Sequence, residues 1–201
     1  MTPPREDGIP TLYAPDQAAW RTWLAAHHET ESRIWLIIYR KQSGIPSVYY
    51  DEAVDEALCF GWIDSKPNKR DENSFFQFFS RRDPTSNWSK VNKTKVERLL
   101  REGRMAPAGL AMVELAQQTG TWTALDEVEA LIIPPDLQAA LEAQPNALQH
   151  FVAFPPSARR GILEWILNAR RPETRQKRIT ETARLAAQNI RANQFTPKTK
   201  P

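Results

Sequence analysis

The residues best suited to chemistry are two adjacent arginines, Arg81 and Arg82, followed closely by Ser86 and Ser89. We predict a helix over 86–102 with either serine as its N-cap, so its free amides and positive dipole end follow the arginines. Arginine offers a planar fork of donors that suits a carboxylate or a phosphate. The spacing therefore predicts a site for a small anion.

Four neighbouring residues are further candidates for this site. Trp62 or Trp88 could stack on the base or ring of a nucleotide. Asn92 falls on the apolar face of the predicted helix, where a buried amide needs hydrogen bonds, so it either braces a backbone turn or contacts a ligand. Asp64 either belongs to the site or forms an ion pair with one of the two arginines.

The single cysteine, Cys59, is not expected to act as a nucleophile. On a helical wheel it lies among Glu52, Asp55 and Glu56, near the end of a predicted helix, and these surroundings raise the pKa of a thiol. One cysteine also excludes an intramolecular disulfide and a multi-cysteine metal site.

Signatures of common enzymes are missing from the sequence. It has no His-Glu-x-x-His, Cys-x-x-Cys, glycine-rich phosphate loop or Gly-x-Ser-x-Gly elbow. The adjacent His27 and His28 point to different sides of a helix and cannot share a metal. The carboxylates are scattered, so no acid–base pair stands out. We therefore expect no metal, no cofactor and no conventional hydrolase.

The net charge of +3 hides an asymmetry along the chain. From Pro155 onward there are eleven basic and three acidic residues, whereas 1–154 holds sixteen basic and twenty-one acidic residues. A basic tail on an acidic body is typical either of a solvated helix face or of a surface that binds nucleic acid. The candidate residues for nucleic-acid binding are Arg170, Arg171, Arg175, Lys177 and Arg178. Aromatic residues are sparse among them, which argues against stacking on single strands.

The elements that must position these residues indicate an α+β fold. Sixteen prolines and only seven glycines favour helices with defined ends over an all-β architecture. Periodicity and breaking residues first predict a helix over 17–28 after Asp16, a strand over 33–40 that is apolar on both faces, a helix capped by Asp51, and a hairpin over 62–65 and 74–80. The rest of the chain is predicted to be helical, with helices over 86–102, from Pro107 to Gly120, and over 126–132, 135–143, 146–153, 157–170 and 172–192.

This order predicts a small, mostly antiparallel sheet packed by helices, with an all-helical C-terminal segment. We place the boundary within Ile132–Asp136, which gives domains 1–131 and 132–201; the alternative is that the two form one unit. The N-terminus lacks the apolar run of a secretory signal, and no stretch approaches the ~20 apolar residues of a membrane span. We therefore expect a cytoplasmic protein without membrane insertion.

Four blocks of the sequence resemble a known family, the YdeI/OmpD-associated proteins, also called bacteriocin-protection or OmdA-like proteins. The blocks are Tyr50–Ser65, Ser80–Asn92, Gly103–Gly109 and Pro172–Ile179. The resemblance extends over roughly Trp20 to Ala187. Asp83 departs from the family pattern, in which a proline usually follows the arginine pair directly, and an acid there would partly neutralise an anion site.

The resemblance implies a role in resistance to cationic antimicrobial peptides or bacteriocins, together with an outer-membrane porin. An acidic body could attract a cationic peptide. The residues themselves favour a stress-associated binding protein with a small-anion or nucleotide site. Nucleic-acid binding and a protein-interaction role are the alternatives.

Overall fold

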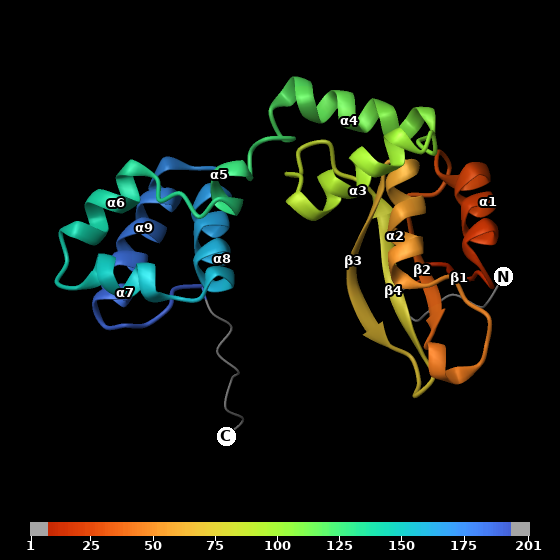
Figure 1. The fold of residues 1–201 in the computed structure, drawn as a ribbon, viewed down its shortest axis with the longest axis horizontal. Helices are drawn as coiled ribbons and strands as arrows, with labels where there is room; N and C mark the ends of the chain where they lie inside the picture. The colour runs from red at the N-terminus through yellow and green to blue at the C-terminus, as the bar shows by residue number, and fades with distance from the viewer. Residues whose placement is uncertain (1–7, 194–201) are drawn as a thin grey trace. The chain divides into compact units, whose positions relative to one another are not determined.

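The structure, a computed structural model, describes residues 8–193. The chain divides into two compact units, Met1–Ala124 and Leu125–Pro201, the first α+β and the second all-helical (Figure 1). This architecture confirms the predicted fold class. The units divide after Ala124, whereas the domain boundary was predicted between residues 131 and 132.

In the described part of the first unit, residues 8–124, the sheet has four strands in the order β1-β2-β4-β3. They are β1 (Thr11–Tyr13), β2 (Arg33–Tyr39), β3 (Trp62–Lys69) and β4 (Ser74–Arg81). The predicted hairpin is formed by β3 and β4, and β2 pairs antiparallel with β4. The short edge strand β1 pairs parallel with β2 and was not predicted, because three residues are too few to show a periodicity.

The helices that accompany this sheet are α1 (Gln17–His27), α2 (Tyr50–Cys59), α3 (Lys90–Arg101) and α4 (Pro107–Thr119), with a 3₁₀ turn η1 (Lys41–Ser43) before α2. Asp16 caps α1 as predicted, accepting the Ala19 N–H at 2.8 Å. The predicted cap of α2 is wrong. Tyr49 takes that position, and Glu52 accepts its N–H at 2.9 Å, so Asp51 falls inside the first turn.

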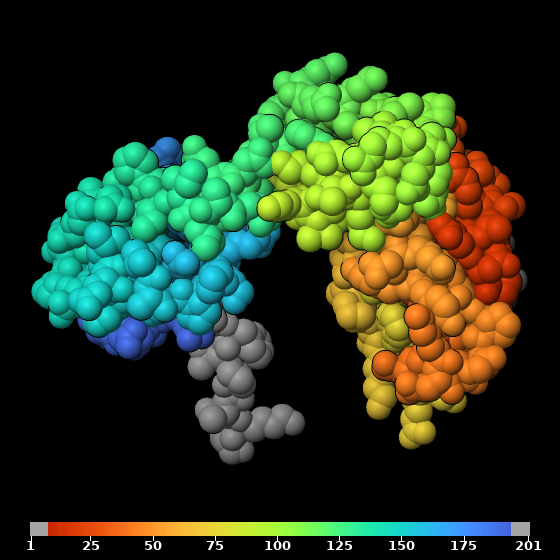
Figure 2. Space-filling model, viewed as in Figure 1, coloured from red at the N-terminus to blue at the C-terminus, as the bar shows by residue number. Residues whose placement is uncertain are grey.

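Helices α1 and α2 cover one face of the sheet (Figures 1 and 2). The core there joins Trp20 of α1 and Leu58 of α2 to Leu36 and Phe79 of the strands, and all four side chains are at most 1% exposed. The alternation of β2 puts Trp35 on the opposite face, where it packs edge-on against Phe78. Both faces of β2 are therefore apolar, as predicted.

A close crossing joins the end of α2 to the start of α4. A Cβ on Gly109 would lie 2.2 Å from the carbonyl oxygen of Cys59, which already accepts the Ala106 N–H at 3.0 Å. Only glycine allows this approach. Cys59 is fully buried at the crossing, so its place on the acidic side of the wheel did not mean exposure. Burial first, and Glu56 second, raises the pKa of its thiol, as predicted in direction.

The second unit contains α5 (Asp126–Glu129), α6 (Pro135–Glu142), α7 (Ala147–Ala153), α8 (Pro156–Leu167) and α9 (Pro172–Ala187). Each was predicted to within a few residues, because proline starts α6, α8 and α9. The core of this unit is apolar and includes Leu141, Phe151, Ile162 and Ile179. Within residues 8–193, none of the helices combines the length and the apolar character that crossing a bilayer requires.

Candidate anion site

The backbone around Arg82 is fixed by the β3–β4 hairpin and by the turn at Gly61, between α2 and β3. Strand β4 ends at Arg81, opposite Trp62, and the next N–H, that of Arg82, donates to the Gly61 carbonyl at 3.0 Å. Gly61 has φ +72°, a left-handed conformation that suits glycine, and this turns the chain from α2 into β3. The arginine pair is thus held where the hairpin meets the end of α2.

The guanidinium of Arg82 folds back over its own loop. Its Nη2 donates to the Asn87 carbonyl at 2.6 Å, and its Cζ lies 3.7 Å from the centre of the Trp88 ring. Arg82 is only 6% exposed. No carboxylate in residues 8–193 lies within ion-pair distance of it, and its buried Nε makes no hydrogen bond there. Burial lowers the pKa of Arg82 to about 10, so the side chain is charged at pH 7.

Arg82 lines a cavity of about 460 Å³ in the first unit. The described lining comes from the end of α1, the α2–β3 turn, the end of β4 and the start of α4. It consists of His28, Glu29, Phe60, Gly61, Trp62, Arg81, Arg82, Pro84, Ala108 and Met112. Arg81 is exposed, and its guanidinium donates to the carbonyls of Glu29 and Glu31. The cavity therefore contains one buried and one exposed guanidinium.

The predicted aromatic and acidic members of the site lie as follows. Trp62 lines the cavity but is 1% exposed, and its Nε1 donates to the His28 carbonyl at 3.4 Å. Trp88 is 2% exposed beneath Arg82. Buried rings of this kind present no open face on which a base could stack. Asp64 accepts the Tyr50 hydroxyl at 2.8 Å and makes no ion pair with either arginine.

Of the two serines predicted as alternative caps, Ser89 is the N-cap, and Ser86 is not. Helix α3 begins at Lys90, and Ser89 is its N-cap, accepting the Asn92 N–H at 3.3 Å. Ser86 is not in the helix, because its N–H and Oγ both donate to the Asp83 carbonyl in a turn. The half-buried Asn92 is fixed through its backbone. None of these three predicted residues is in the described lining of the Arg82 cavity.

Asp83, the residue that departs from the family pattern, organises the turn that contains Ser86. Its Oδ1 accepts both the N–H and the hydroxyl of Thr85, each at 2.8 Å. Arg82 is not among its ion-pair partners in the described part of the chain. Asp83 therefore does not neutralise the buried Arg82 by direct pairing.

Two of the basic residues predicted for nucleic acid make contacts inside the second unit. Arg175 forms a bidentate pair with Asp136, with N–O distances of 2.7 and 3.0 Å. Arg178 donates to the Trp165 carbonyl and lies over that ring at 4.9 Å. These donors hold α9 against α6 and α8.

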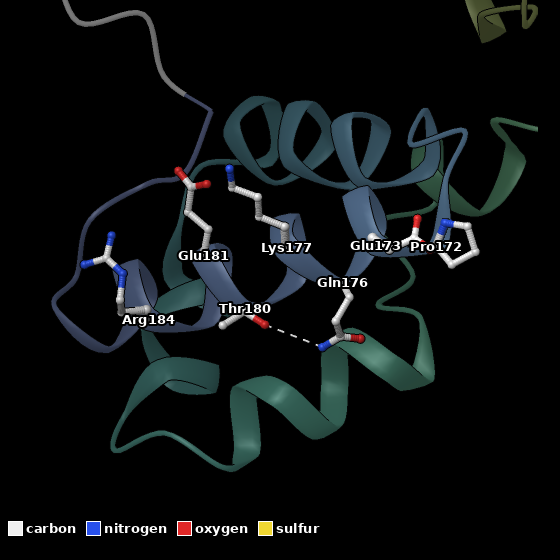
Figure 3. A pocket seen from close by; sticks show the side chains of 7 residues that line it. All are labelled: Pro172, Glu173, Gln176, Lys177, Thr180, Glu181 and Arg184. Atoms are coloured by element: carbon white, nitrogen blue, oxygen red, sulfur yellow. Dashed lines mark hydrogen bonds between the residues drawn. The ribbon is translucent and has the colours of Figure 1, made fainter.

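The other three predicted basic residues are exposed. Arg170 and Arg171 precede α9, and Lys177 lies on its solvent face. Figure 3 shows Lys177 and Glu181 extending side by side from this helix, with Glu173 one turn before. Together with Pro172, Gln176, Thr180 and Arg184, these three residues form a stripe along α9. Its charges alternate in sign rather than forming a basic track.

A second charged cavity in the first unit, of about 560 Å³, was not predicted. Glu56 is 2% exposed there and accepts three charged or polar donors. Arg21 and Arg104 each lie 2.6 Å from one of its oxygens, and the Gln17 amide lies 2.7 Å away. The wheel had shown Glu56 only as part of a polar helix face, since its partners lie far away in sequence.

The residues that sequence reasoning missed in the Arg82 cavity are mostly apolar or remote, such as Phe60, Ala108 and Met112. No spacing signal relates them to Arg82. Among residues 8–193, the side chains of His, Cys, Asp and Glu form no group of three or more suited to a metal ion.

The fold and the cavities define a two-unit α+β protein, with a sheet unit that surrounds a buried arginine and a helical unit that follows it. Residues 12–112 match the family described as a domain of unknown function (DUF8412). Residues 130–189 match the family described as bacteriocin-protection, YdeI or OmpD-associated (OmdA). The chain therefore belongs to the DUF8412 family, and its helical unit is similar to the YdeI/OmpD-associated family.

These matches confirm the family predicted from the sequence blocks. The Pro172–Ile179 block lies in the part that matches the YdeI/OmpD-associated family, whereas the three earlier blocks lie in the part that matches DUF8412. Searches of curated proteins and of solved structures each gave no match.

Proposed function

We propose that the sheet unit binds a small anion in the Arg82 cavity. The observation that supports this is a buried guanidinium, 6% exposed, that lines a cavity and has no carboxylate partner in the described residues. A buried charge is costly unless a counter-charge compensates it. An anion in the cavity would supply that counter-charge.

The surroundings of Arg82 keep its charge in place for a ligand. Stacking on Trp88 and the bond to the Asn87 carbonyl fix the guanidinium without neutralising it. Because its pKa of about 10 lies well above neutrality, the side chain stays cationic at pH 7. Arg81 adds an exposed positive charge that would attract an anion from solution.

The structure gives less support to the two alternative functions, nucleic-acid binding and protein interaction, than to anion binding. The basic C-terminal surface is interrupted by Glu173 and Glu181, and Arg175 is paired with Asp136. A sequence-independent nucleic-acid surface would need a continuous positive track. Protection against bacteriocins, which one family description names, would require a partner protein or peptide, and this stays a prediction.

A thermal-shift screen tests the proposal. Purified full-length protein is heated at constant ionic strength with phosphate, acetate, benzoate or AMP, beside a chloride reference. We expect at least one anion to raise the Tm of the wild-type protein and to have no such effect on Arg82→Met, which removes the charge but keeps an apolar stem.

Arg101→Gln is the matched control, because Arg101 is an exposed arginine on α3 outside the cavity. It should respond to each anion like the wild-type protein. Equal shifts in the wild-type protein and Arg82→Met, or no shift with any anion, would overturn the proposal.

A further inference from the structure

We infer that the ligand of the Arg82 cavity is a small monocarboxylate with an apolar body, rather than a nucleotide or another phosphate ester. The inference rests on the proposed anion site and specifies its chemistry. Three features of the cavity carry it: its charge, its walls and the donors that remain on Arg82.

The formal charge of the described lining is close to one positive unit. Arg81 and Arg82 contribute two positive charges, and Glu29 contributes one negative charge. The Glu29 carboxylate is 83% exposed and lies 3.8 Å from Nε2 of His28, at the solvent side of the site. One net positive charge suits a singly charged ligand. A dianionic phosphate would bring an excess negative charge into a partly desolvated space.

The walls of the cavity are largely apolar. Phe60 and Trp62 are 7% and 1% exposed, and Pro84, Ala108 and Met112 complete this surface. Met112 packs against Gly61 so closely that a Cβ on the glycine would lie 2.9 Å from its Cγ. The hydroxyl groups of a ribose would find few partners against such walls, and unpaired buried hydroxyls oppose binding.

The donors of Arg82 also suit a carboxylate. Its Nη2 donates to the Asn87 carbonyl, and its Nε is shielded from solvent and makes no hydrogen bond within residues 8–193, so a ligand would approach the terminal Nη edge of the guanidinium. A carboxylate is satisfied by one edge of a guanidinium, because its two oxygens match the donor fork. A phosphate dianion, with three terminal oxygens, is held best by several cations or by a nest of amides. The helix start that could provide such amides lies at Ser89, outside the described lining.

The cavity volume of about 460 Å³ agrees with this class of ligand, since pockets for small molecules commonly measure a few hundred Å³. A benzene ring or a short alkyl chain would contact Phe60, Ala108 and Met112, and its carboxylate would be directed at the arginines. The apolar body would then supply most of the contact area, and the charge would set the orientation.

Isothermal titration calorimetry of the full-length protein, at pH 7.5 and constant ionic strength, tests the inference. The ligands are benzoate, hexanoate, benzamide, phenyl phosphate and AMP. We expect benzoate or hexanoate to bind at least tenfold more tightly than phenyl phosphate and AMP, and benzamide, the neutral counterpart of benzoate, to show no binding.

A pair of variants at one wall position sharpens the test. Met112→Glu places a negative charge beside the site and should weaken carboxylate binding at least tenfold, whereas Met112→Gln, which has the same length without the charge, should change it less than threefold. Circular dichroism checks that both variants are folded. Because these variants leave Arg82 in place, they test the cavity without removing its buried charge.

The outcomes separate the two proposals. Tighter binding of phenyl phosphate or AMP than of both carboxylates would overturn the monocarboxylate inference and leave the anion site standing. Binding of benzamide equal to that of benzoate would overturn it as well, since the charge would then be irrelevant. Equal weakening by Met112→Glu and Met112→Gln would place the carboxylate away from this wall and also contradict it. Absence of binding by all four anions would overturn both proposals.

Discussion

The cavities around Glu56 and around Arg82 in the sheet unit each contain a pair of arginines, but among the described lining residues only the Glu56 cavity has a buried carboxylate. Glu56 lies between Arg21 and Arg104, at 2.6 Å from each. The cavity of Arg81 and Arg82 contains no comparable group, since Glu29, the acidic residue of its described lining, is 83% exposed. The first cavity supplies its own anion, and the second leaves that place for a ligand.

The pKa values of the arginines reflect this difference. Burial acts to lower the pKa of Arg21, but the hydrogen bond and charge of Glu56 outweigh it, and the pKa is raised. Arg104 responds in the same way. For Arg82 burial acts alone and lowers the pKa to about 10. Arginines in one small unit therefore show opposite shifts, and the presence of a carboxylate decides the direction.

The largest expected effect is at Glu56. Replacing it with Ala leaves Arg21 and Arg104 facing each other across an empty site, and breaking a buried pair of this kind costs about 3 kcal/mol. Urea denaturation followed by tryptophan fluorescence measures the loss. Asp51→Asn is the control on the same helix, because the Asp51 carboxylate is 84% exposed and its pair with Lys95 is screened by water. Similar losses in the two variants would show that the Glu56 cluster adds no more stability than an exposed carboxylate.

The opposite result is expected at Arg82. Arg82→Met removes a buried charge that lacks a carboxylate partner, so the relief of desolvation offsets the lost bond to Asn87 and the lost contact with Trp88. We expect the free energy of unfolding to stay within about 1 kcal/mol of the wild-type value, a much smaller change than in Glu56→Ala. A loss as large as that of Glu56→Ala would mean that Arg82 is a structural residue and would remove the contrast between the cavities.

Local sequence signals predicted the elements but not these two cavities. An apolar run with both alternate sets of side chains apolar identified β2, and two extended runs separated by polar residues identified the β3–β4 hairpin. Strand β3 continues to Lys69, beyond the predicted range of 62–65. Proline at helix starts and glycine at their ends gave most boundaries. These signals act within a few residues, so they specify local backbone structure without specifying what packs against it.

The contacts that decide the chemistry join distant segments. Glu56 meets Arg21 across 35 positions and Arg104 across 48, and no periodicity records such pairings. The arginine pair at 81–82 was identified because adjacent arginines are conspicuous. The helix start expected beside it is capped by Ser89, one of the two predicted caps, but does not lie in the described lining of the Arg82 cavity. Thr85 and Ser86, which lie between the arginine pair and the helix, instead hydrogen-bond to Asp83 in a turn.

The charge asymmetry of the sequence has a similar explanation. All acidic residues of 125–154 lie in a stretch without lysine or arginine, and the following segment is strongly basic. In the helical unit, Asp136 pairs with Arg175 and Glu129 with Arg160. Opposite charges that are separated along the chain thus meet within one unit. A segment-by-segment count of charge overstated the basic surface for this reason.

Acid sensitivity of the helical unit should be reduced by Asp136→Asn. Arg175 holds the pKa of Asp136 below its usual value of 3.8. The ionised carboxylate therefore stabilises the fold above that pH, and the stabilisation is lost as the pH falls through the folded-state pKa. Because this pair is partly exposed, the effect is smaller than at Glu56. The Tm, measured by thermal unfolding between pH 6 and pH 3, should fall less steeply with pH in the variant than in the wild-type protein. Parallel curves of Tm against pH would contradict the pairing.

The smallest expected effect concerns Cys59, because the pKa of its thiol depends on the carboxylate of Glu56. Burial and then Glu56 raise the pKa of the thiol, whereas Arg21 and Arg104 lower it. Glu56→Gln removes one raising contribution and leaves both arginines, so thiolate formation becomes easier and modification by a disulfide reagent at pH 8 should quicken several-fold. Arg82→Met, in the other cavity, should leave the rate unchanged. The rate in Glu56→Gln must exceed the rate that its unfolded fraction, measured by denaturation, accounts for. If unfolding explains the whole increase, the charge of Glu56 does not act on the thiol in the folded state.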